Sequence, residues 1–165
     1  MPSIVYVSNT GHTKRYAELL SRLTGFPAFP AKQAKRELLK NEEIIYFGWL
    51  FAGSIKGYSA AARRHNIIAV CGVGLGDTGS QLDTVRKTAK IPAELPLFTL
   101  QGGMDHQKLK GIYKFMISML TKAISSKQQR TDDEEKMLQL LVDGGDFVDR
   151  AHLQDVIAWI EEHHI

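Results

Sequence analysis

The sequence predicts an α/β fold in which helices cover both faces of a parallel β-sheet. Short apolar runs rich in β-branched residues alternate with helical patterns, as in βαβ units. Of the 165 residues, 44% are hydrophobic and 24% are charged, which is typical of an ordinary globular protein. We therefore expect a single domain, residues 1–165, with one sheet at its centre.

The first strand and helix are predicted from residues 3–25. Ser3–Ser8 is a short apolar run with the composition of a strand. Gly25 is expected to end the helix that follows, because glycine readily adopts the left-handed conformation of a helix C-cap. Prolines flank the next, weaker strand candidate, Phe26–Phe29, which favours an edge position. Apolar residues recur at the spacing of one helix face at Tyr16, Leu19, Leu20 and Leu23.

Three further strands are predicted in the middle of the chain. Glu43–Trp49 and Ile67–Val73 are continuous apolar runs, which favours central positions in the sheet. A helix of small residues, Tyr58–Arg64, is expected between them. Asp83–Ala89 is expected to be helical, and Pro96–Leu100 is the fifth strand.

The last third of the chain predicts three helices. The first, Lys108–Ile124, is basic and strongly apolar. Thr131 and Glu134 have the spacing of a capping box and open an acidic helix that ends at Gly144. Asp149 is expected to cap the final helix, whose apolar face comprises Leu153, Val156, Ile157 and Ile160.

The net charge of +3 conceals two regions of opposite sign. Residues 1–130 hold 19 Lys and Arg against 8 Asp and Glu, a net +11, whereas residues 131–165 hold 2 against 10, a net −8. A basic surface suits an anionic membrane or an acidic partner. Because no nucleic-acid-binding motif accompanies it, we expect no nucleic-acid partner.

The basic helix Lys108–Ile124 carries more apolar residues than one buried face needs. One stripe is expected to pack on the sheet: Leu109, Ile112, Tyr113, Met116, Leu120 and Ile124. Three residues fall outside it, namely Phe115, Ile117 and Met119. Either this surplus contacts an anionic membrane or a partner, or the acidic helix covers it with Met137, Leu138 and Leu141. We favour the second interpretation because it also explains the charge division.

Cysteine content and hydropathy predict a cytoplasmic protein. The single cysteine, Cys71, cannot form an internal disulfide, and its place inside an apolar strand favours a core position. No signal-peptide pattern opens the sequence, and no apolar run approaches the roughly 20 residues that span a bilayer. Any membrane contact is therefore expected to be peripheral, at the inner face. The six histidines lack ligand spacing, so we predict no metal site.

The turn between the first strand and first helix predicts a phosphate site. A helix N-terminus offers unpaired backbone N–H groups and the positive end of a dipole, and neighbouring hydroxyls add donors. The turn lacks the Gly-Lys-Ser/Thr ending of a triphosphate-binding loop, which favours a monophosphate. An ordinary helix cap is the alternative. The candidate residues are Ser8, Asn9, Thr10, Gly11, His12 and Thr13.

This turn resembles the FMN-phosphate signature of the flavodoxin superfamily. The superfamily pattern is Thr/Ser-x-Thr-Gly-x-Thr, and residues 8–13 match it at every defined position. The resemblance implies a five-stranded sheet of order 2-1-3-4-5 with one non-covalently bound FMN. It also implies flavin-based electron transfer without a catalytic acid or base from the protein, so no catalytic residue is predicted.

In flavodoxin-like proteins, the loops after strands three and four hold the flavin ring. The first of these loops is glycine-rich and is expected to be flexible, with an aromatic residue stacked on the ring. Alternatively, its aromatic residues fill the core. The candidate residues are Trp49, Leu50, Phe51, Ala52 and Gly53.

The loop after strand four resembles the Gly-x-Gly-Asp loop of flavodoxins, whose backbone approaches the pyrimidine end of the flavin. Its candidate residues are Gly74, Leu75, Gly76 and Asp77. With Gly79, the loop also spells the G-x-G-x-x-G dinucleotide fingerprint. We reject that interpretation, because the fingerprint belongs in the first βα turn and the next strand here carries no carboxylate.

Strand five and the basic helix resemble the menaquinone-dependent protoporphyrinogen dehydrogenases within this superfamily. The resemblance is carried by residues 100–105, Leu-Gln-Gly-Gly-Met-Asp, and by the Phe-Met-Ile sequence at 115–117. It implies oxidation of a porphyrin precursor and reduction of a quinone at the membrane. The stretch Gly79–Leu95 is shorter than the basic loop of that family.

Three functions therefore fit the sequence. An FMN-binding electron carrier would serve a redox partner protein, and a dehydrogenase would use a quinone and a small-molecule substrate. A flavin-free interaction module is the third. A phospho-accepting response regulator is excluded, because the first strand ends in Ser8 and Asn9 where an acidic cluster is required.

Overall fold

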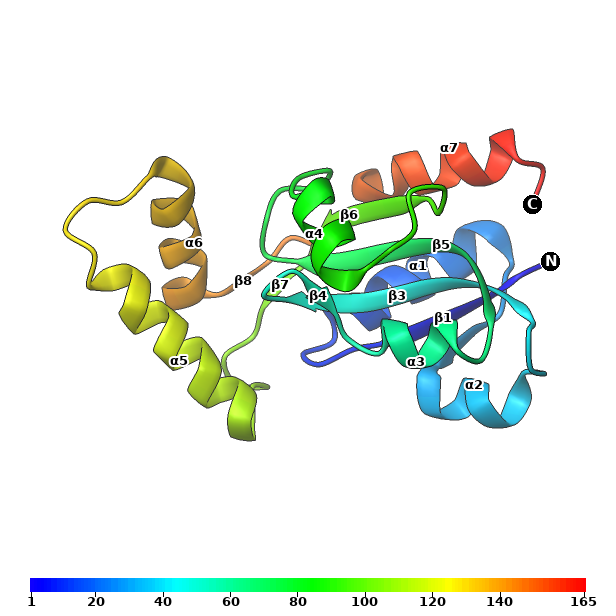
Figure 1. Cartoon of the computed structure of the whole chain (residues 1–165), viewed down its shortest axis with the longest axis horizontal. Coiled ribbons are helices and arrows are strands. Elements are labelled where there is room, and N and C mark those ends of the chain that lie inside the picture. The colour runs from blue at the N-terminus through cyan, green and yellow to red at the C-terminus, as the bar shows by residue number, and fades with distance from the viewer.

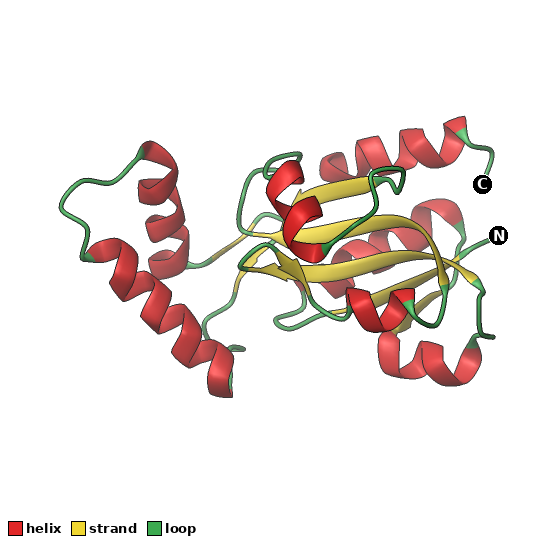
Figure 2. Cartoon of the chain, in the orientation of Figure 1, coloured by secondary structure: helices red, strands yellow, loops and turns green.

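The computed structural model describes all 165 residues, and a parallel sheet of five strands forms its central layer (Figures 1 and 2). The strand order is β2-β1-β3-β5-β6, and the short β4 pairs antiparallel with the end of β3. When β4 is set aside, this is the predicted 2-1-3-4-5 order. The strands are β1 (Ser3–Val7), β2 (Ala28–Pro30), β3 (Glu43–Phe51), β4 (Ser54–Ile55), β5 (Asn66–Gly74) and β6 (Leu97–Gln101).

Helices cover both faces of the sheet and complete a three-layer α/β sandwich. One face is covered by α1 (His12–Thr24), the 3-10 helix η1 (Arg150–Leu153) and α7 (Gln154–Glu162). The opposite face is covered by α2 (Ala31–Glu37), α3 (Tyr58–Ala62) and α4 (Leu82–Ala89). The predicted fold class is thus confirmed.

Alternation along the strands explains why their sequences are apolar throughout. Ile45 and Phe47 of β3 pack towards α1 and α7, whereas Ile44 and Tyr46 pack towards α2, α3 and α4. All four side chains are fully buried. Cys71 of β5 is also fully buried, and burial raises the pKa of its thiol, which fits the predicted core position.

Two predictions about the first half of the chain need correction. Strand β3 continues to Phe51 and folds back through Ala52 and Gly53, both at positive φ, into β4. The expected flexible loop is therefore a tight hairpin held by strand pairing. Helix α2 was not predicted, because only Ala34 of its seven residues is buried and its sequence carries no apolar stripe.

Two helices between β6 and η1 stand apart from the sheet (Figure 1). They are α5 (Gly111–Ser125) and α6 (Asp132–Asp143), and we name residues 105–144 the insertion. The prediction that an apolar stripe of α5 is buried on the sheet is wrong, since none of the helix's residues is buried, although Tyr113 packs against Trp49 of β3. Helix α5 also begins at Gly111 rather than Lys108. Neither helix, nor any other in the structure, combines the length and apolarity that crossing a bilayer requires.

The two helices of the insertion pack against each other in part. The capping box of Thr131 and Glu134 is present, as predicted. Ile117 of α5 belongs to the same hydrophobic cluster as Met137 and Leu141 of α6, so the expected cover by the acidic helix exists for Ile117. The cover that α6 provides does not extend across α5, because Phe115 is 64% exposed and Met119 is 54% exposed.

A two-stranded antiparallel ladder forms the neck of the insertion. It pairs β7 (Gly103–Met104) with β8 (Gly145–Asp146). Gly103 lies at φ +133°, and a Cβ there would collide with the carbonyl group of Gly145. Beside the neck, the Gly102 carbonyl accepts from the Phe147 amide, while the Gly102 amide donates to Gly74. Only glycine permits these two segments of the backbone to approach so closely.

Gly103→Ala should therefore separate the neck strands and loosen the insertion. We expect faster amide hydrogen exchange across residues 105–144 while the amides of the central sheet keep their protection. Mass spectrometry of deuterium uptake measures both regions at once. Gly111→Ala is the control, because Gly111 also has positive φ but no atom lies within 4 Å of an added Cβ. Equal uptake in the two variants would contradict the role of the neck.

Candidate functional site

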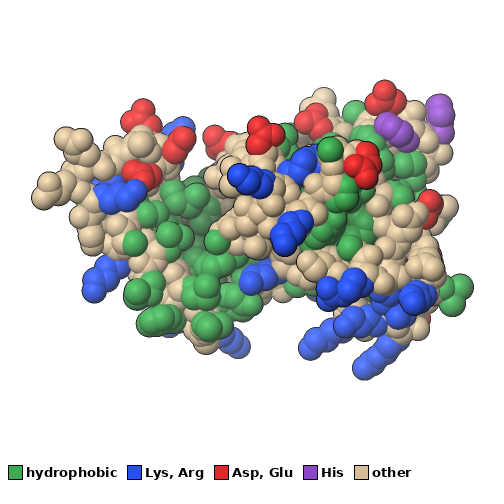
Figure 3. Space-filling model, in the orientation of Figure 1, with side chains coloured by type: hydrophobic (Ala, Val, Ile, Leu, Met, Phe, Trp, Pro, Cys, Tyr) green, Lys and Arg blue, Asp and Glu red, His purple; other side chains and the backbone are tan.

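A cavity of about 870 Å³ lies between the carboxyl ends of the parallel strands and the insertion. Of its 29 lining residues, 19 are hydrophobic and none is Lys, Arg, Asp or Glu. Apolar side chains gather over the insertion and continue towards the sheet, as Figure 3 shows. The volume of the cavity is typical of pockets that bind a drug-sized or cofactor-sized ligand.

The structure brings the three predicted loops together around this cavity. Twelve of the fifteen predicted site residues line it: Asn9, Thr10, His12, Thr13, Trp49, Leu50, Phe51, Ala52, Gly53, Gly74, Leu75 and Gly76. The other three, Ser8, Gly11 and Asp77, do not. Parallel strands end at the same edge of a sheet, so the loops after β1, β3 and β5 meet there.

The first loop leaves the N-terminus of α1 without a partner from the chain. Gly11 is the N-cap at φ +104°, no side chain caps the helix, and its first turn contains no acidic residue. The amides of the first turn therefore lack acceptors within the helix. The hydroxyl oxygen of Ser8 is buried and has no hydrogen-bond partner. Such unsatisfied donors are costly unless a ligand or water pairs with them.

His12 connects the first loop to the neck of the insertion. It is 8% exposed, and its Nδ1 lies 3.0 Å from the Thr10 hydroxyl. Its Nε2 lies 4.0 Å from Oδ1 of Asp146, and Arg15 donates a 2.5 Å hydrogen bond to the other oxygen of that carboxylate, Oδ2. Burial lowers the pKa of His12, although Asp146 opposes this shift. At neutral pH the imidazole is therefore uncharged.

Three aromatic rings form a wall on the sheet side of the cavity. Trp49 and Phe51 point to the same face of β3 because they are two residues apart. Tyr113 of α5 completes the group, with its ring centroid 4.9 Å from that of Trp49 at an interplanar angle of 83°. The Lys56 ammonium lies 5.5–5.8 Å from all three ring centroids, a cation–π arrangement.

The loop after β5 offers backbone to the cavity. Leu50 of β3 packs directly over Gly72 and Gly74 of β5, and added Cβ atoms at these glycines would press on its side chain. Further along, the Thr78 hydroxyl accepts from Gln101, and the Gly79 amide donates to a β6 carbonyl. Helix α4 begins later, at Leu82. The final glycine of the dinucleotide fingerprint is therefore not at a helix start.

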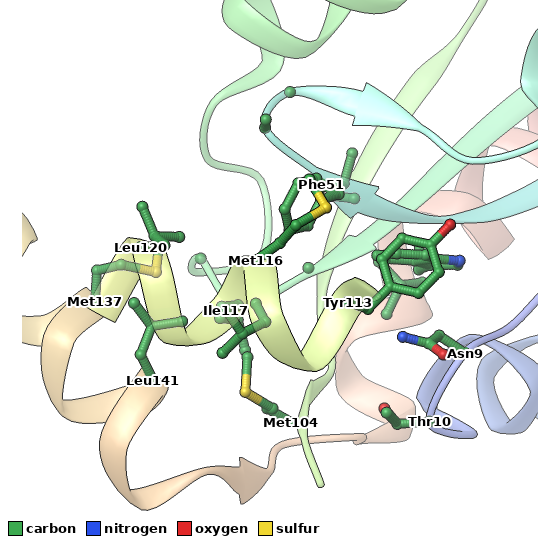
Figure 4. A pocket seen from close by; sticks show the side chains of 18 of the residues that line it. Asn9, Thr10, Phe51, Met104, Tyr113, Met116, Ile117, Leu120, Met137 and Leu141 are labelled. Atoms are coloured by element: carbon green, nitrogen blue, oxygen red, sulfur yellow. The ribbon is translucent and has the colours of Figure 1, made fainter. Parts of the chain in front are cut away.

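The insertion supplies lining residues that the sequence analysis did not assign to the site. Figure 4 shows Tyr113 and Met116 of α5 among the lining side chains, together with Asn9, Thr10 and Phe51 from the sheet side. The opposite part of the cavity is apolar and rich in methionine. Its side chains include Met104, Ile117, Leu120, Met137 and Leu141. The available signal is the apolar content of α5: the sequence assigns its stripe to sheet packing and its surplus residues to cover by the acidic helix, whereas residues of both groups line the cavity.

The buried histidines predict how stability depends on pH. Burial lowers the pKa of both His12 and His65 from 6.5, so the unfolded chain binds protons more readily than the folded protein. The resulting stability is fully present above about pH 6.5 and declines as the pH falls below it. Denaturant unfolding between pH 7.5 and roughly pH 5 measures the slope. We expect His65→Gln to flatten it and the exposed His106→Gln to leave it unchanged. Equal slopes in all three proteins would refute the assignment.

No family model, curated protein or solved structure matches this chain.

Proposed function

We propose that this protein binds FMN in the cavity and transfers electrons through it. One observation carries the proposal. An uncapped helix N-terminus, an aromatic wall and a glycine-rich strand end meet at one cavity, at the carboxyl edge of a sheet of order 2-1-3-4-5. In open α/β sheets, ligands bind at this edge, where the strand order reverses.

The first loop suits a phosphate monoester. The amides of the first turn of α1 offer donors to an anion. The hydroxyls of Thr10 and Thr13 lie on the same loop, and both residues line the cavity. The Ser8 hydroxyl has no partner in the chain, but Ser8 does not line the cavity, so the amides and the two threonines support the phosphate site.

The aromatic wall and the loop after β5 suit a flat ring system. Trp49 and Phe51 offer aromatic surface to one side of the cavity, and Gly74 and Gly76 contribute side-chain-free backbone to its lining. When bound, FMN supplies the transfer of one or two electrons. The protein then contributes orientation, exclusion of water and the electrostatic environment. Backbone amides near the ring would stabilise negative charge on it.

An electron-carrier role serving a protein partner follows most directly from this arrangement. No Asp, Glu, Lys or Arg lines the cavity, and His12 is its one imidazole. Electron transfer through a bound flavin requires no acid or base from the protein.

A second candidate is a membrane-peripheral dehydrogenase that passes electrons to a quinone. The observation that favours it is the exposed apolar surface of α5, where Ile112 is 67% exposed and Phe115 is 64% exposed. Lys110, Lys114 and Lys122 belong to the same segment and would attract an anionic bilayer. The apolar part of the cavity suits an uncharged substrate.

Titration with FMN tests the first proposal. Purified protein should take on the yellow colour of the flavin and quench its fluorescence at a one-to-one ratio. Trp49→Leu should weaken FMN binding roughly three- to tenfold through loss of ring contact. Trp159→Leu is the matched control, because the chain has two tryptophans and Trp159 lies on α7, outside the cavity. Colourless protein that leaves FMN fluorescence unquenched would overturn the proposal.

Vesicle sedimentation and redox assays test the second candidate, the membrane-peripheral dehydrogenase. Binding to anionic vesicles should weaken several-fold in Ile112→Ser, because that side chain would leave the apolar layer. Val142→Ser on α6 is the control, since Val142 is 58% exposed on the acidic helix. Flavin reduction by protoporphyrinogen and reoxidation by a menaquinone analogue are expected of the dehydrogenase. If the protein showed neither vesicle binding nor turnover, the dehydrogenase candidate would be excluded and the carrier role would be the remaining one.

A further inference from the structure

The insertion reaches the first loop from both sides of its neck. At its exit, Asp146 approaches His12 and pairs with Arg15. At its entry, the Lys108 ammonium lies 3.9 Å from the point where a Cβ would stand on Gly11. Because Gly11 is the N-cap of α1, this places a cation of the insertion beside the proposed phosphate site.

Two other basic side chains, Arg15 and Lys14, lie near this helix end. Arg15 is held by Asp146 at 2.5 Å. Lys14 and Lys108 each form an exposed ion pair beyond hydrogen-bond distance, at 3.6 Å from Glu18 and 3.8 Å from Asp105. Of these two ammonium groups, that of Lys108 lies within 4 Å of the Cβ position of Gly11.

The ion pair that Lys108 makes is loose. Its ammonium lies 3.8 Å from an Asp105 oxygen, too far for a hydrogen bond, and the side chain is 64% exposed. An exposed pair of this kind contributes little stability. A phosphate monoester carries about −1.5 to −2 charges at neutral pH and has three acceptor oxygens. It would compete effectively with a single carboxylate for the ammonium group.

We propose that Lys108 binds the phosphate group of the cofactor and thereby lets the insertion distinguish phosphorylated from unphosphorylated flavin. This inference rests on the proposed phosphate site and adds to it a residue from outside the first loop. The loop has no lysine of its own in residues 8–13, and Lys108 supplies that charge from 95 residues downstream of its end. Phosphate binding then also fixes the entry of the insertion over the cavity.

Affinities for FMN and riboflavin, which differ only in the phosphate, test this role. Lys108→Met should bind FMN about five- to tenfold more weakly than the parent protein, with riboflavin affinity unchanged. Its FMN affinity should also depend less on salt. Lys110→Met is the matched control, because Lys110 has the same charge two residues away. We expect it to bind both flavins as the parent does.

Equal losses for FMN and riboflavin, or no loss for either, would overturn the role of Lys108. Titration with inorganic phosphate, followed by ³¹P NMR, separates this inference from the FMN proposal. Suppose that the parent protein binds phosphate but neither flavin, and that Lys108→Met binds phosphate more weakly. That result would support the role of Lys108 in phosphate binding and refute FMN as the ligand. A parent protein that binds neither phosphate nor flavin would refute both.

Discussion

The close backbone approach between Gly103 and Gly145 determines how the rest of the site is built. A side chain at Gly103 would collide with the Gly145 carbonyl, so the β7–β8 ladder exists only because glycine occupies this position. The ladder turns the chain away from the sheet after β6 and returns it forty residues later beside α1. Helices α5 and α6 consequently stand beyond the carboxyl edge of the sheet, and the space between them and the strand ends becomes the cavity.

This placement gives the cavity two chemically different parts. Near the first loop it offers amides, hydroxyls and an uncharged imidazole, whereas under the insertion it is lined by methionine and aliphatic side chains. Methionine adapts to irregular shapes, so this part can accept ligands of varied outline. A ligand with one anionic end and a flat apolar body matches such a division. The same neck brings Asp146 to His12 and Lys108 to Gly11, which joins the insertion to the polar part.

The charge division of the sequence has a local component within the insertion. Lys127 and Arg130, in the connection between its helices, pair with Glu134 and Glu135 at the start of α6. These exposed pairs contribute little stability, and they do not cover the apolar surface of α5. Ile112 and Phe115 remain largely exposed. The acidic helix therefore accounts for part of the charge pattern and leaves the exposed apolar surface for a partner or a bilayer.

Local patterns in the sequence were sufficient for the strands, most helices and the meeting of the three loops. Apolar runs and helical periodicity indicate which face of an element is buried. Gly25 ends α1 and the Thr131 capping box begins α6, in each case through contacts within a few residues. Parallel strand order then brings the loops after β1, β3 and β5 to one edge. The position of α5 could not be obtained this way, because periodicity does not say which surface an apolar stripe will meet. Tyr113 against Trp49, Asp146 against His12 and Lys108 against Gly11 are contacts between residues 64 to 134 positions apart, and they arise only once the glycine neck has folded.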